Sequence, residues 1–267
     1  MKPLIEVSDL SKLYFLESSK HPKLMDSLGH WWSRLTNKDH LQQTLTRKKL
    51  LHSTELNWGP KPNTFWALKD VSLSVQQGEV VGILGRNGSG KSTLLKILSK
   101  ITSPTSGYSI LRGRVSSVIK MGAGFHPELT GRENIYLNSV ILGMRKREVN
   151  RKFDEIVSFA ELGEFIDMQI KHYSEGMHSR LAFAVAAHLN PQILLLDEVL
   201  AIGDHFFQTK CLDKIQEMVR RGLAVMFVSH NIEVIRTLCS SALLLEKGCS
   251  ERFSDCEAAI EKYLAQN

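Results

Sequence analysis

The chain has 267 residues and a formal net charge of +6 at neutral pH, and its hydrophobic (43%) and charged (23%) fractions are those of a folded globular protein. These values exclude collagen-like, coiled-coil and disordered chains, and no apolar run approaches the roughly 20 residues that cross a bilayer. The basic excess favours an acidic partner, such as a phosphate ligand, an anionic lipid or a nucleic acid.

The first predicted element is a strand over residues 3–14, and a basic insertion over residues 15–62 follows it. The insertion has eight Lys and Arg against four Asp and Glu, so it carries +4 of the net charge. Within it, Leu24, Leu28 and Trp31 recur at helical spacing and predict a short amphipathic helix. Two interpretations of this helix stay open. It contacts anionic lipid headgroups, a protein partner or a phosphate-bearing substrate, or it packs its apolar stripe on the core and leaves its basic face in solvent.

Apolar strands and helices alternate after the insertion. This alternation predicts an α/β fold with a parallel sheet and an inserted α-helical subdomain. The predicted elements are a buried strand over 79–84, a helix from 92, a helical subdomain over about 125–190, strands over 193–196 and 224–228 separated by a charged helix, and a short helical tail over 250–267. The clearest predicted helices are residues 132–142, 146–160 and 179–189 in the subdomain and residues 256–265 in the tail.

Residues 85–93, GRNGSGKST, match the phosphate-loop pattern G-x-x-x-x-G-K-[ST] between a predicted strand and a predicted helix. Glycines let successive backbone N–H groups converge on phosphate oxygens, and the helix N-terminus favours the same anion. Lys91 would neutralise the β- and γ-phosphates of a nucleotide, and the Ser92 hydroxyl would bind Mg²⁺. The candidate nucleotide-binding residues of this loop are Gly85, Arg86, Asn87, Gly88, Ser89, Gly90, Lys91, Ser92 and Thr93.

Two carboxylates follow the apolar strand 193–196 and complete a predicted hydrolytic site. Strands of this kind carry ligands at their carboxyl ends. We expect Asp197 to hold Mg²⁺ together with Ser92, and Glu198 to act as the general base that polarises the attacking water.

Three further motifs appear in the second half of the chain. Residues 173–177 read Tyr-Ser-Glu-Gly-Met, residues 197–204 read Asp-Glu-Val-Leu-Ala-Ile-Gly-Asp, and residues 228–230 read Val-Ser-His. They resemble, respectively, the signature, the Walker B motif with its D-loop, and the switch histidine of ATP-binding-cassette (ABC) ATPases. Together with the phosphate loop, they follow the order of these motifs in that family. The resemblance covers almost the whole chain. It implies a single ABC domain over 1–267 with a RecA-like, phosphate-loop NTPase core.

The resemblance also implies a mechanism in which two copies pack head to tail and trap two ATP molecules. Each ATP would lie between the phosphate loop of one copy and Ser174 and Gly176 of the other, and His230 would contact the γ-phosphate and hold Glu198 and the water in place. By the same resemblance the nucleotide contacts extend to Ser174, Glu175, Gly176, Met177 and Asp204.

Tyr14 resembles the aromatic residue that stacks on adenine in this family. The alternative is a tyrosine on the inward face of the first strand, and the sequence leaves both interpretations open.

Two positions depart from the family pattern. Met121 stands where the family usually has a glutamine, and a thioether is a poor Mg²⁺ ligand. Glu175 replaces a glycine of the signature and adds a negative charge close to the triphosphate. Both departures predict a slow ATPase.

Residues 122–137, GAGFHPELTGRENIYL, together with the signature and the D-loop, are similar to the ATP-binding subunits of bacterial exporters of O-antigen, capsule or teichoic acid. This similarity implies a peripheral protein on the cytoplasmic face of the inner membrane. Its expected partners are a second copy, two membrane-spanning permease subunits and, through the complex, a lipid-linked polysaccharide, with no nucleic acid. Because the chain ends soon after the core, we expect no C-terminal carbohydrate-binding domain.

Three other functions stay open. The first is an ABC ATPase for another transported substrate, the second an ABC protein acting on DNA or the ribosome, and the third a small-molecule kinase. The basic insertion lacks dense Arg runs and stacking aromatics, which disfavours the second, and the signature, D-loop and His230 disfavour the third.

Overall fold

The computed structural model describes residues 2–15, 57–60, 63–118, 124–197, 205–229 and 231–266. Most of the basic insertion over 15–62, including its predicted amphipathic helix, lies outside these residues. The short strand β2 (Asn57–Trp58), near the end of the insertion, is described and pairs with β3.

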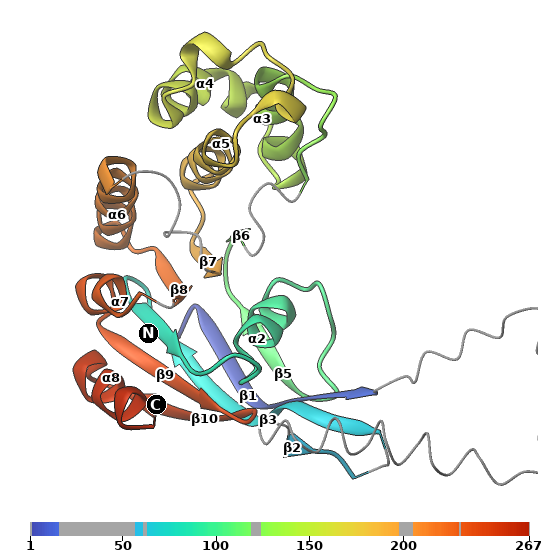
Figure 1. The fold of residues 1–267 in the computed structure, drawn as a ribbon, viewed down its shortest axis with the longest axis vertical. Helices are drawn as coiled ribbons and strands as arrows, with labels where there is room; N and C mark the ends of the chain where they lie inside the picture. Colours follow the sequence, from blue (N-terminus) through green and yellow to red (C-terminus); the bar gives the residue numbers. More distant parts are fainter. Residues whose placement is uncertain are drawn as a thin grey trace, which may run out of the picture.

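The centre of the fold is a six-stranded sheet in the order β10-β9-β4-β8-β7-β6 (Figure 1). Its inner strands pair in parallel, and only β10 runs antiparallel to its neighbour β9. The parallel sheet that the alternating pattern predicts is therefore present. Its strands are β4 (Val80–Leu84), β6 (Val115–Val118), β7 (Ile193–Asp197), β8 (Ala224–Val228), β9 (Ser241–Glu246) and β10 (Cys249–Phe253).

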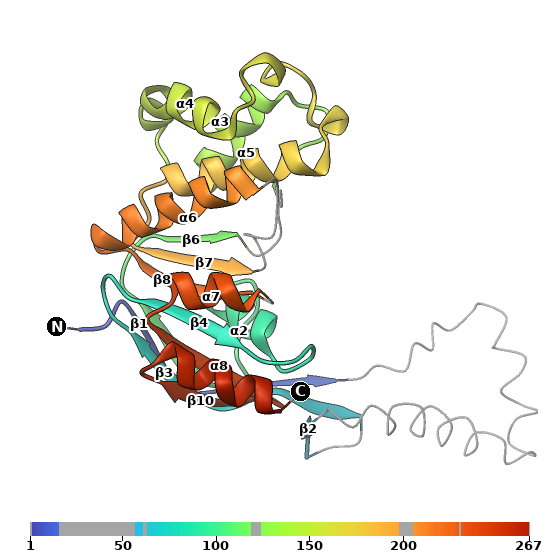
Figure 2. The same ribbon diagram turned by 60° about the vertical axis from the view of Figure 1, so that its left-hand side comes forward.

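Both faces of this sheet are covered, which explains the continuous apolar runs of its strands. Successive side chains of a strand point to opposite faces, so Val80 and Leu84 join one apolar cluster and Val81 and Ile83 the other. Helices lie along both faces of the sheet (Figures 1 and 2). These helices are α6 (His205–Arg220), α7 (Ile232–Leu238) and α8 (Cys256–Ala265) on the first face, and α2 (Lys91–Leu98) on the second.

A second, antiparallel sheet in the order β2-β3-β1-β5 packs over α2 and was not predicted from the sequence. Its central pair joins β1 to β3 across the whole insertion, for example through Ile5 opposite Val75. Local patterns identify the individual strands but not this long-range pairing. The strands are β1 (Ile5–Phe15), β3 (Thr64–Val75) and β5 (Ser106–Leu111), besides β2.

The helical subdomain has an apolar core of its own, which includes Ile135, Phe153 and Leu181. A capping box begins its first helix, because the Thr130 hydroxyl accepts from Glu133 N while the Glu133 carboxylate accepts from Thr130 N. Its elements are α3 (Gly131–Ile141), α4 (Lys146–Ala160), the short 3-10 turns Gly163–Phe165 and Ile170–His172, and α5 (Glu175–His188).

Helix α5 belongs to both cores. Phe183 and Ala187 pack against the sheet, whereas Leu181 and Val185 pack within the helical subdomain. A helix that is apolar on all sides is a buried helix, and here it connects the subdomain to the sheet (Figure 2).

Within the C-terminal tail over 250–267, the predicted helix over 256–265 is confirmed as α8, and a strand precedes it. Strand β10 occupies Cys249–Phe253, and α8 begins at Cys256, where the Asp255 carboxylate caps it by accepting from Glu257 N and Ala258 N. No helix within the described ranges combines the length and the apolar character that a membrane span requires.

The packing of α5 on the sheet predicts the effect of removing one ring. Phe183 is fully buried and stacks on Phe159, with ring centroids 6.0 Å apart. We expect Phe183→Ala to lower the free energy of unfolding by about 3–5 kcal/mol, because the substitution leaves a cavity. The control is Phe206→Ala, at a ring that is 73% exposed, with an expected change within about 0.5 kcal/mol. Urea denaturation measures both, and equal losses would contradict this account of the core.

Candidate nucleotide-binding site

Three chain segments of the candidate site meet at one edge of the parallel sheet. Ile83 and Asp197 both pair with Val228, so β4, β7 and β8 end side by side. The phosphate loop after β4, the carboxylate of Asp197 and Ser229 after β8 therefore come together, as the sequence analysis predicts for Asp197 and the loop.

The phosphate loop has a backbone that only glycines adopt without strain. Gly85, Gly88 and Gly90 have φ values of +148°, +82° and +112°. A Cβ at Gly90 would collide with the main-chain oxygen of Ala67, whereas a Cβ at Gly88 would meet no atom within 4 Å. The loop is thus packed against β3 at one end and open at Gly88.

The Lys91 side chain folds back over this loop. It is only 6% exposed, and its ammonium group donates to the carbonyl oxygens of Gly85 (2.6 Å) and Arg86 (3.0 Å). Beside it, the buried Ser89 hydroxyl has no hydrogen-bond partner among the described residues. Because buried polar groups are almost always satisfied, this hydroxyl and the cation above the loop fit a polar, anionic ligand.

Helix α2 begins directly after the loop. Its N-cap is Gly90, no side chain caps it, and its first turn contains no acidic residue. The first N–H groups of a helix have no partner within the helix, so they form an anion site with a partial positive charge. Ser92, in this first turn, is exposed and Thr93 half-buried.

Asp197 is the last residue of β7 and is half-buried at the sheet edge. Glu198, Asp204 and His230 lie outside the described residues, so their roles stay predictions. The chain on either side of His230 is described. Ser229 is buried, and its hydroxyl accepts from Asn231 N at 3.0 Å.

The signature residues form the first turn of α5. The predicted helix over 179–189 is present and extends one turn further toward the N-terminus. It begins at Glu175, because the Ser174 hydroxyl caps it by accepting from Met177 N at 3.2 Å. Glu175 is exposed, and a Cβ at Gly176 would meet only the Ser174 hydroxyl at 3.8 Å. The surface at this turn is therefore open.

Tyr173 fixes this turn to the subdomain. Its hydroxyl donates to Phe165 O at 2.8 Å and lies against Gly131, where a Cβ would collide with it. Burial raises the pKa of Tyr173 to about 12, so the hydroxyl keeps its proton at neutral pH.

Tyr14 is half-buried near the end of β1. Its ring stacks on Phe65 at 5.7 Å between centroids, and the ammonium group of Lys12 lies 5.1 Å from its centroid. A half-buried ring fits both an adenine-stacking role and a structural one, so the role of Tyr14 stays a prediction.

Two asparagines of α3 that the sequence analysis did not assign hold the loop before the subdomain. Buried Asn134 accepts from His126 N and donates to three carbonyl oxygens of the 126–130 segment, and Asn138 donates to Gly124 O. The sequence feature that could have identified these two asparagines is their i, i+4 spacing on an otherwise amphipathic helix. Met121, just before this loop, lies outside the described residues.

Comparison with known proteins agrees with this arrangement. The family model described as ABC transporter matches residues 68–201. The chain is 45% identical over 203 residues to the O-antigen export system ATP-binding protein RfbB of Klebsiella pneumoniae, which covers 76% of this chain and 82% of that protein. It is 43% identical over 232 residues to the teichoic acids export ATP-binding protein TagH of Enterococcus faecalis, covering 86% of this chain and 51% of that protein.

Two solved structures share the fold. "Structure of ATP binding subunit of ABC transporter" superposes with a TM-score of 0.71 at 18% identity, over 98% of this chain and 99% of that one. The dimeric structure of a post-hydrolysis state of the ATP-binding cassette MJ0796, bound to ADP and Pi, superposes with a TM-score of 0.68 at 22% identity, over 93% and 98%. The predicted fold class is confirmed, and the chain belongs to the ABC transporter family as an ATP-hydrolysing cassette.

Proposed function

We propose that this chain is the ATPase subunit of an ABC transporter that exports a lipid-linked polysaccharide, such as O-antigen or teichoic acid, across the cytoplasmic membrane. The observation that carries the proposal is its 45% identity, over most of both chains, to an O-antigen export ATP-binding protein. The meeting of the phosphate loop with Asp197 at one sheet edge supports the ATPase part. By the same proposal the protein is peripheral, on the cytoplasmic face of the membrane.

We assign the ATP phosphates to the open side of the phosphate loop, with Lys91 neutralising their charge. The exposed Ser92 hydroxyl and the Asp197 carboxylate are hard oxygen donors, which suit Mg²⁺. Bound there, Mg²⁺ would neutralise charge that develops on the phosphates. Glu198 polarises the water, and His230 holds Glu198 in place.

The open first turn of α5 supports the second half of the site. It lies on the helical subdomain, whereas the phosphate loop lies on the sheet. We propose that a second copy brings its signature, Ser174 to Met177, and its Asp204 to the ATP held by the first copy. Glu175 already lies at a helix N-terminus, where a carboxylate is favourable.

An exposed apolar surface on α3 suits a membrane-spanning permease partner. Leu137, Val140 and Ile141 are 36%, 53% and 63% exposed. A recess of about 660 Å³ lies among Tyr136, Leu137, Val140, Lys146 and Asn150. We propose that a cytoplasmic segment of each permease subunit packs here.

The open space at Gly88 gives a test of phosphate binding. Gly88→Ala should fold at a cost of about 1–2 kcal/mol for its left-handed φ, but should weaken binding of a fluorescent ATP analogue, because the new methyl enters the space assigned to the phosphates. Gly143→Ala is the matched control, since Gly143 also has a positive φ and open surroundings. Equal affinities of the two variants for the ATP analogue would contradict the assignment of the phosphates to this side of the loop.

Export itself is tested in the native host with Glu198→Gln. Without the general base, hydrolysis should stop, so that lipid-linked polysaccharide accumulates on the cytoplasmic side and surface glycan is lost. Fractionation and immunodetection of the glycan measure both, with protein abundance as the control. Normal surface glycan would instead favour another transported substrate or a function outside transport.

The permease contact predicts the effect of a charge on α3. Val140→Glu should abolish co-purification with the permease while the isolated subunit keeps its ATP binding, because a carboxylate opposes burial of this apolar surface. Leu264→Glu, on the exposed side of α8 (52% exposed), is the control and should co-purify normally. Co-purification of both variants would exclude this surface from the contact.

A further inference from the structure

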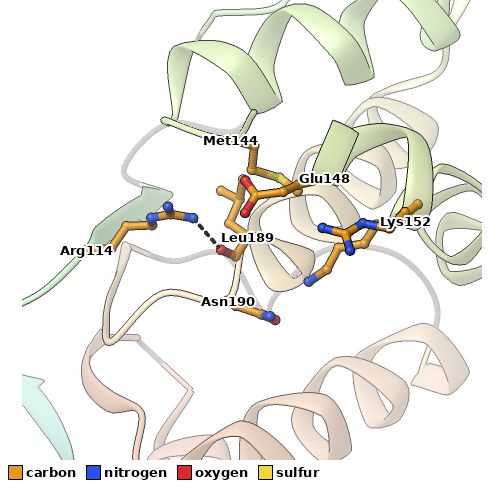
Figure 3. A pocket seen from close by; sticks show the side chains of 7 residues that line it. Arg114, Met144, Glu148, Lys152, Leu189 and Asn190 are labelled. Carbon is orange, nitrogen blue, oxygen red and sulfur yellow. Dashed lines mark hydrogen bonds between the residues drawn. The ribbon is translucent and has the colours of Figure 1, made fainter. Parts of the chain in front are cut away.

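A basic cavity lies at the sheet edge opposite the nucleotide site. Arg114 directly precedes β6, and Val115 pairs with Ile193 at the start of β7, whereas Asp197 ends β7. The cavity has a volume of about 180 Å³ and is formed between the sheet and the helical subdomain (Figure 3). Its lining residues are Arg114, Met144, Glu148, Arg151, Lys152, Leu189 and Asn190.

Positive charge exceeds negative charge in this cavity. Arg114, Arg151 and Lys152 face one carboxylate, Glu148. That carboxylate accepts from Arg145 N at 2.9 Å in the first turn of α4, and this hydrogen bond is the main cause of its lowered pKa. Glu148 is therefore ionised and neutralises one of the three cations, which leaves two positive charges.

A structural role explains part of this cluster. The Lys152 ammonium group donates to His188 O at 2.7 Å, and the Arg114 guanidinium donates to Leu189 O at 3.3 Å. Both cations thus cap the C-terminal end of α5, where its partial negative charge favours them. Figure 3 shows Arg114 and Lys152 on either side of Leu189 and Asn190.

This capping does not explain Arg151. It lines the cavity, is exposed, and has no hydrogen bond or ion pair with any residue in the described part of the chain. Burial lowers the pKa of Lys152; the carboxylates of Glu155 and Glu148 oppose this effect, and the cations of Lys214 and Arg114 add to it. Among the residues that line the cavity, the cations therefore outnumber the carboxylates.

We propose that this cavity binds a phosphate group, which is carried either by a small molecule free in solution or by a lipid headgroup. A guanidinium fork matches phosphate oxygens in geometry and charge, and two residual positive charges match a dianion. The volume is below the roughly 300–1,000 Å³ of sites for larger organic ligands. Because Arg114 directly precedes β6 of the sheet and Arg151 and Lys152 lie on α4, the ligand would contact both parts of the molecule.

The test measures binding of radiolabelled inorganic phosphate by equilibrium dialysis. The protein is first saturated with a non-hydrolysable ATP analogue, which occupies the phosphate loop. We expect one saturable phosphate per chain, with affinity reduced about tenfold in Arg151→Gln, as loss of one charge-assisted hydrogen bond predicts. Arg147→Gln is the matched control, because Arg147 is also an exposed arginine of α4 but does not line the cavity.

Three results would overturn the proposal. They are no saturable phosphate binding, phosphate binding that is seen without the ATP analogue but is lost completely with it, or equal phosphate affinities in the two variants. Flotation with phosphatidylcholine vesicles containing phosphatidic acid identifies the source of the phosphate. Vesicle binding that depends on Arg151 and is displaced by free phosphate assigns the group to a lipid headgroup. Binding in dialysis alone assigns it to a small molecule free in solution.

Discussion

The parallel pairing of β4, β8 and β7 is the constraint on which the nucleotide site depends. These strands are almost entirely buried, and their registers place Ile83, Val228 and Asp197 in one row. A shift of one residue would turn every side chain of a strand to the opposite face, which two separate apolar cores forbid. Packing in the middle of the sheet therefore positions the phosphate loop and the carboxylate at its edge.

Helix α5 connects the packing of the sheet to that of the helical subdomain. Its N-terminal turn presents Ser174, and its middle contributes Phe183 to the sheet core and Leu181 to the subdomain core. Movement of the signature relative to the phosphate loop must therefore repack α5 against one core or the other. Closely packed interfaces of this kind change between discrete arrangements rather than deforming continuously.

Sequence patterns predicted the elements of this fold better than their pairing. The limits of α4, Lys146–Ala160, follow from its apolar period alone, and the phosphate loop follows from glycines at fixed spacing. Helix α5 extends one turn beyond the apolar pattern over 179–189, because Ser174 caps it and Glu175 begins its first turn. The antiparallel sheet could not be predicted because β1 and β3 pair across an insertion. The cation cluster at Arg151 could not be predicted either, because Arg114 and Arg151 are distant in the sequence.

The two ends of α5 connect these observations. Its 14 residues make a rod about 21 Å long, which carries the signature at its N-terminus and meets the basic cavity at its C-terminus. Lys152, from the subdomain, and Arg114, beside the sheet, donate hydrogen bonds to the last carbonyl groups of this helix. The proposed phosphate between them would draw both cations toward itself and weaken their hydrogen bonds to those carbonyl groups. A ligand bound there would therefore act, through this helix, on the orientation of its N-terminal turn, which in the proposed dimer contacts the ATP of the other copy.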